Sequence, residues 1–99
     1  MTAPPPEIDL NRAAVQAALA ALREGRSTGD ATLDRVADAL GRRRAHAWAH
    51  LRGACPDVPE AAIDLAADRV VDVLAAIPAV VVRMVVADAV KCAAAGGAS

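Results

Sequence analysis

Apolar residues recur every three or four positions along most of this chain, in blocks that glycine and proline residues separate. Val15 and Leu19 mark one block, and Leu33, Val36 and Leu40 mark the next. This spacing places apolar side chains on one face of an α-helix. The sequence has one Trp and neither Phe nor Tyr, so its 56% of hydrophobic residues are mostly small and aliphatic. We therefore expect an all-α fold in which helices pack closely, because small side chains bury little area each.

The helix-breaking residues predict a small bundle of four helices, or of five if the chain also breaks at Gly41. Asn11 is placed to cap the first helix, and Gly25 to close it. Asp57 and Glu60 have the spacing of a capping box at the start of the third helix. The expected helices span residues 9–25, 30–52, 57–77 and 79–95.

A chain of 99 residues has room for one domain. Three consecutive prolines, Pro4 to Pro6, prevent a helix from beginning before the last of them, so we expect residues 1–8 to form a disordered, proline-rich arm. Residues 9–95 then form a single helical domain, and residues 96–99 form a flexible tail.

Charge is distributed unevenly along the chain, although the formal net charge is only −1. Residues 23–52 hold seven Arg against four acidic residues, a balance of +3, and residues 53–99 have a balance of −3. The near-neutral total argues against binding nucleic acid by electrostatics alone. We expect the basic middle and the acidic C-terminal half to pair, within one chain or between subunits.

The third expected helix has two sides of different chemistry. On one side acidic residues repeat every four positions, where like charges repel by roughly a few tenths of a kcal/mol per pair unless arginines from elsewhere offset them. This acidic stripe consists of Glu60, Asp64, Asp68 and Asp72. The other side is mostly apolar and consists of Ala62, Leu65, Ala66, Arg69, Val70, Val73 and Leu74.

The last expected helix, residues 79–95, contains six valines and is apolar over most of its circumference. A helix of this kind is buried in the bundle or in a subunit interface. We therefore expect a homo-oligomer. The expected interface residues are Val73, Leu74, Ile77, Val81, Val82, Val85 and Val86.

Most of the chemically distinctive residues lie in the stretch 33–53, which holds three consecutive Arg, both His and the only Trp. Gly41 lies between two runs of apolar residues at helical spacing, namely Leu33, Val36, Ala37 and Leu40 before it and Ala47 and Leu51 after it. Residues 33–52 resemble the helix-turn-helix motif of bacterial DNA-binding transcription regulators, in which a glycine opens a tight turn before the recognition helix. The resemblance implies contacts to DNA by Arg42, Arg43, Arg44, His46 and Trp48.

The stretch departs from that motif at two places. Arg42 follows the glycine where the motif normally has an apolar residue, and the turn lacks a Ser or Thr that would cap the second helix. The alternative is one continuous helix from Asp30 to Arg52, whose arginines form a charged face. A glycine inside a helix costs only about 1 kcal/mol relative to alanine, which permits this alternative.

The sequence predicts no enzymatic activity, catalytic residue, cofactor or small-molecule substrate, because it lacks a glycine-rich phosphate loop and a nucleophile elbow. Cys55 and His50 are the residue types of a nucleophile and base pair, but nothing in the sequence brings them together. His46 and His50 share a helix face at a spacing of four, and a third metal ligand would have to come from Cys55 or Asp57. We interpret both histidines as surface residues without a metal.

The longest uncharged run in the apolar C-terminal segment, residues 73–82, has ten residues, whereas a membrane span needs about twenty. The N-terminus has no basic region followed by an apolar run, and the two cysteines have no CxxC spacing. We expect a cytoplasmic protein that does not contact a membrane.

Two functions follow from these features. The first is a small DNA-binding regulator that dimerises through its last two helices. The alternative is a protein-interaction or assembly module, such as an adaptor or structural component of a phage or bacterial complex, that does not bind DNA. A backbone break at Gly41 favours the first function, and an unbroken helix favours the second.

Overall fold

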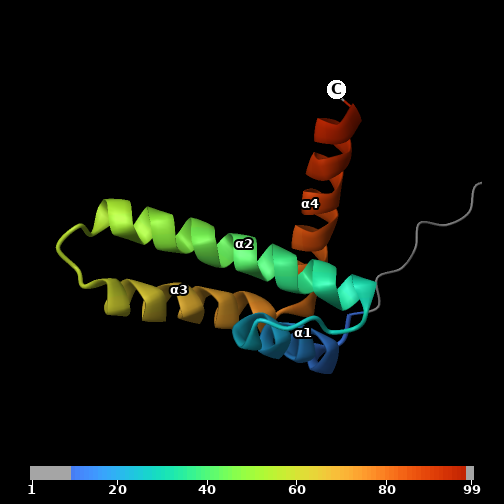
Figure 1. Cartoon of the computed structure of the whole chain (residues 1–99), viewed down its shortest axis with the longest axis horizontal. Coiled ribbons are helices and arrows are strands. Elements are labelled where there is room, and N and C mark those ends of the chain that lie inside the picture. The colour runs from blue at the N-terminus through green and yellow to red at the C-terminus, as the bar shows by residue number, and fades with distance from the viewer. Residues whose placement is uncertain (1–9, 98–99) are drawn as a thin grey trace, which may run out of the picture.

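The computed structural model describes residues 10–97, and within that range it is all-helical, with four helices and no strand (Figure 1). This confirms the all-α prediction. The helices are α1 (Arg12–Glu24), α2 (Ala31–Ala54), α3 (Glu60–Ala75) and α4 (Pro78–Gly97). The arm predicted for residues 1–8 and the last two residues of the predicted tail lie outside the described range. The first two residues of that tail belong to α4.

Local chemistry sets the ends of α1 and the start of α2. The side chain of Asn11 accepts a hydrogen bond of 2.8 Å from the backbone N–H of Ala14, as an N-cap does. Gly25 closes α1 in the left-handed conformation, with φ of 68°, which glycine adopts without steric cost. Asp30 caps α2 by accepting two backbone N–H groups of its first turn.

The start of α3 differs from the prediction. Pro59 occupies the N-cap position and no side chain caps the helix, so the capping box expected from Asp57 and Glu60 is wrong. The physical reason is that a capping box needs its first residue at the N-cap, and Asp57 lies two residues before it. Proline is tolerated there because the first N–H groups of a helix have no partner within it.

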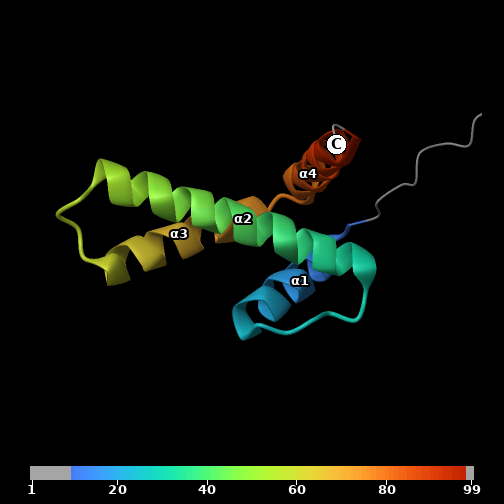
Figure 2. The ribbon, with the colours of Figure 1, turned by 45° about the horizontal axis from the view of Figure 1, so that its top comes forward.

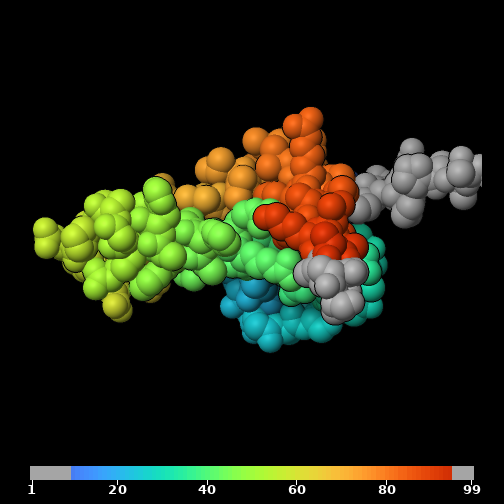
Figure 3. Space-filling model, turned by 90° about the horizontal axis from the view of Figure 1, so that it is seen from above, coloured from blue at the N-terminus to red at the C-terminus, as the bar shows by residue number. Residues whose placement is uncertain are grey.

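Helices α2 and α3 form an antiparallel hairpin that is the long axis of the molecule (Figures 1 and 2). Helix α1 packs beside the N-terminal half of α2 and the C-terminal half of α3. Helix α4 leaves α3 at a bend of 103°, and its C-terminal half stands clear of the other helices. The end of the hairpin that carries the loop 55–59 also extends beyond α1 and α4 (Figure 3).

The core lies where all four helices meet. Val15, Leu40, Val71 and Val81 come from α1, α2, α3 and α4 in turn, and each is at most 1% exposed. The remaining core residues are also Ala, Val and Leu, with one Met, as the composition predicted. Trp48 lies outside this cluster and is half-buried on α2.

Gly41 lies inside α2, which runs without a break from Ala31 to Ala54. Of the two alternatives for this stretch, the continuous helix is the one that forms. A Cβ atom at Gly41 would lie 3.3 Å from the terminal Cδ1 of Leu22 on α1. The glycine therefore lets α1 approach α2 closely.

No single helix in residues 10–97 is long and apolar enough to cross a membrane. Helices α3 and α4 meet the length and hydropathy requirements only as a bent pair.

Candidate functional site

The three consecutive arginines of α2 point toward two different helices. Successive residues of an α-helix are rotated by about 100°, so neighbouring side chains diverge. Arg43 donates from Nη2 to Oδ1 of Asp88 on α4 at 3.0 Å, and Nη1 of Arg42 lies 3.5 Å from the other carboxylate oxygen of Asp88. Arg44 donates from Nε to Oδ1 of Asp68 on α3 at 3.2 Å. The arginine run therefore connects α2 to both of the helices that follow it.

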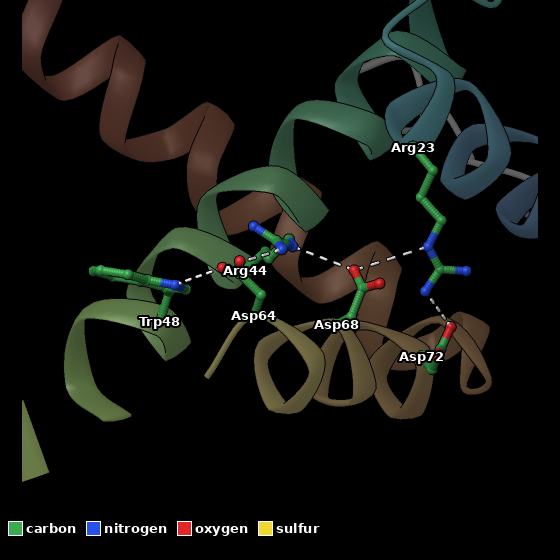
Figure 4. A network of polar contacts seen from close by, with 6 residues as sticks. All are labelled: Arg23, Arg44, Trp48, Asp64, Asp68 and Asp72. Carbon is green, nitrogen blue, oxygen red and sulfur yellow. Dashed lines mark hydrogen bonds and ion pairs between the residues drawn. The ribbon is translucent and has the colours of Figure 1, made fainter. Parts of the chain in front are cut away.

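Three residues of the acidic stripe, Asp64, Asp68 and Asp72, make a row of polar contacts with α2 and α1 (Figure 4). At one end Asp64 accepts a 2.7 Å hydrogen bond from the indole N–H of Trp48. At the other end Arg23 of α1 donates from Nη2 to Oδ1 of Asp72 at 2.6 Å, and its Nε lies 3.9 Å from Asp68. We call this row, together with Arg44, the α3 ion-pair row. The predicted pairing of the basic middle with the acidic half is confirmed within one chain.

Asp88 is the one buried charged residue in the part of the chain that the structure describes, with 8% of its surface exposed. It lies in a helix that is otherwise mostly Val and Ala, and two guanidinium groups compensate its charge. A buried carboxylate without such partners would be strongly destabilising. Sequence reasoning missed Asp88 as a partner of the arginine run. The only available signal was a lone carboxylate on the side of the helix that carries Val81 and Val85.

The residues predicted to contact DNA are spread over different environments. Arg43, Arg44 and Trp48 are half-buried and engaged with aspartates, as described above. The side chain of Arg42 remains 52% exposed, and His46, four residues further along α2, is also exposed. The turn at Gly41 that would make Arg43 and Arg44 the head of a separate recognition helix is not formed. DNA binding therefore stays a prediction.

The predicted interface residues divide into two groups. Val81 and Val85 are buried in the core, with Leu74 and Val82 packed against it. The other three are exposed, namely Val73 at 65%, Ile77 at 48% and Val86 at 47%. Only these three are open to a partner outside the chain.

Two further apolar side chains, which the interface prediction did not include, are exposed to a similar degree. Leu65 on α3 is 63% exposed, and Val90 on α4 is 62% exposed. Leu65 belongs to the mostly apolar side that the sequence predicted for the third helix. The structure buries the opposite line of α3 instead, which consists of Ile63, Ala67, Val71 and Ala75.

The two histidines and the two cysteines all lie at the surface. His46 and His50 are both exposed on α2, and Cys55 and Cys92 are both exposed free thiols. Within residues 10–97 no three His, Cys, Asp or Glu side chains are grouped so that they could hold a metal ion.

Comparison of the chain with profiles of protein families, with curated proteins and with solved structures finds no match.

Proposed function

We propose that this protein is a protein-interaction module whose binding surfaces are the sides of α3 and α4 that point away from the core. The observation that carries the proposal is the exposure of Leu65, Val73 and Val90, each more than 60% open to solvent on a helix whose opposite side is buried. A surface helix of a monomer normally presents polar residues to water, and larger exposed apolar patches mark interaction sites.

The state of the arginine run supports the same proposal. Arg43 and Arg44 hold α2 against Asp88 and Asp68, so each would have to leave its carboxylate in order to contact a phosphate. In this proposal their role is to orient the helices. Compared with an apolar replacement of both partners, ion pairs of this kind contribute little net stability, and they are better suited to fixing one arrangement.

A photoreactive amino acid placed on the proposed surfaces tests this function. We expect that the residue at position 73 or 90, introduced into the full chain in cells of the source organism, forms a covalent adduct with protein after irradiation. Position 46, exposed on α2, is the matched control and should give no protein adduct. Adducts from position 46 alone, or from none of the three positions, would refute the proposal.

DNA binding is the second candidate, and one observation favours it: Arg42 is 52% exposed although it lies beside Asp88, and His46 is exposed one helical turn further along α2. Contacts from these residues to phosphates would strengthen at low salt. Fluorescence anisotropy of a labelled duplex at low and moderate salt tests this candidate. Binding that strengthens at low salt and weakens in the variant R42A/H46A would support it, whereas unchanged anisotropy at low salt would remove it.

A further inference from the structure

Helix α3 has two apolar faces on opposite sides, and only one of them is used within the chain. The inner line, from Ile63 to Ala75, packs in the core. On the opposite side a second line follows the spacing of three, four, four and three residues that keeps side chains on one face. We call this line the outer face of α3, and its residues are Ala62, Leu65, Arg69, Val73 and Ala76, all exposed.

The outer face of α3 carries charges of both signs beside its apolar side chains. Leu65, Arg69 and Val73 line a shallow groove together with Asp68 and Asp72. Within residues 10–97, Arg69 has no carboxylate within ion-pair distance. The side chain of Asp72 is still 53% exposed after its bond to Arg23. Arg69, a cation without a partner in this range, therefore lies close to Asp72, an anion whose exposed side can accept a second cation.

This pattern is complementary to itself. Around a two-fold axis that passes between Arg69 and Asp72, an antiparallel second α3 places Arg69 of each copy opposite Asp72 of the other. The same register sets Leu65 of each copy against Ala76 of the other, and Val73 lies next to this pair, three residues before Ala76. A parallel pair would instead place the two Arg69 side chains together, which like-charge repulsion opposes.

We propose that the outer face of α3 binds the same face of a second copy of this chain, antiparallel, in a two-fold dimer. The proposal rests on the function proposed above and names the partner for one of its two surfaces. An interface of this type is isologous, so each contact occurs twice. Leu65 and Val73 provide its apolar part, and two Arg69–Asp72 pairs fix its direction and register.

Sedimentation analysis of the full chain, from micromolar to millimolar concentration, tests the dimer. We expect a monomer–dimer equilibrium whose dissociation constant rises by about a hundredfold in R69D, because the substitution places like charges together twice. The charge-swapped variant R69D/D72R should restore dimerisation. R12D, an equal change of charge at an exposed site on α1, is the matched control and should leave the equilibrium unchanged.

Circular dichroism confirms that each variant is folded, so that a lost dimer is not a lost structure. A chain that is monomeric at every concentration would overturn the inference. So would a dimer that R69D leaves intact and V90D on α4 dissociates. Photo-crosslinking at position 73 distinguishes the dimer from the proposed function. If the chain is monomeric and position 73 forms adducts with a different protein, the proposed function stands and the second copy is not the partner.

Discussion

Substitution of Gly41 by alanine distinguishes a continuous α2 from a helix that turns at this glycine. In a helix interior, alanine is more favourable than glycine by about 1 kcal/mol. Gly41 lies in the middle of α2 and does not have a positive φ, so G41A should gain most of this free energy.

The close packing of α1 against α2 opposes the stabilisation expected for G41A. The new Cβ would lie 3.3 Å from Cδ1 of Leu22, which is the far end of a flexible, half-buried side chain. A shift of that methyl group by a few tenths of an ångström relieves the contact. We therefore expect a net stabilisation of about 0.5–1 kcal/mol, which corresponds to a rise in Tm of about 2–8 °C for a domain of this size.

Thermal and urea unfolding followed by circular dichroism at fixed protein concentration measures the change. G25A is the control of opposite sign, because Gly25 has φ of 68° and a side chain there costs about 1–2 kcal/mol. L22A separates the gain in helix propensity at position 41 from the cost of the steric contact, since it removes the side chain that the new methyl group would touch. If G41A destabilises the protein as much as G25A does, and also in the L22A background, Gly41 adopts a turn conformation and the argument for a continuous helix fails.

Two further predictions concern carboxylates. D88A should lower the free energy of unfolding by about 2 kcal/mol, because Arg43 loses its hydrogen-bond acceptor and Arg42 loses its ion-pair partner, and urea unfolding that shows a loss no larger than that of the half-exposed control D72A would contradict this. Hydrogen bonds from the backbone N–H and the hydroxyl of Thr28, with a smaller contribution from Ser27, hold the pKa of Asp34 below 3.8. Because the folded pKa is the lower one, these bonds stabilise the protein fully above the unfolded pKa and are lost as pH falls through the folded value. D34N should therefore lower Tm at neutral pH and lower it less and less as the pH falls through the folded pKa, and an equal loss at neutral and acidic pH would refute the assignment.

Helix ends were the part of the fold that the sequence predicted best, because they depend on side chains a few residues away. Asn11 and Gly25 set the limits of α1 through bonds within one turn of each residue. The exception is α3, where Pro59 occupies the position that a capping side chain would need. A cap is therefore predictable where the sequence offers one suitable residue for the cap position, and not where a proline can occupy that position.

The buried face of α3 was not predictable from spacing alone. The line through Ile63 and Val71 and the line through Leu65 and Val73 are both apolar and both follow the helical period. Their neighbours in space decide between them. The acidic stripe lies beside the inner line, so burying that line brings Asp68 to Arg44 of α2, which burial of the outer line would not do.

The partner of Arg43 was not predictable either, since it depends on the angle between helices. Asp88 meets Arg43 only because α4 leaves α3 at 103° and passes beside the N-terminal half of α2. No periodicity in the sequence encodes that angle. The bend follows from the short connection of two residues before Pro78, which begins a new helix and cannot continue the old one.

The ion pairs and the exposed apolar residues are connected through the small size of the core. A core of Ala, Val and Leu contributes little area per residue, so the orientation of the helices is weakly specified by apolar packing alone. The α3 ion-pair row and the contacts of Asp88 fix the orientation of the helices, and both lie on the inner sides of α3 and α4. Leu65, Val73 and Val90 lie on the opposite sides of these helices and stay exposed. The same arrangement that orients the bundle therefore leaves apolar surface for a partner to cover.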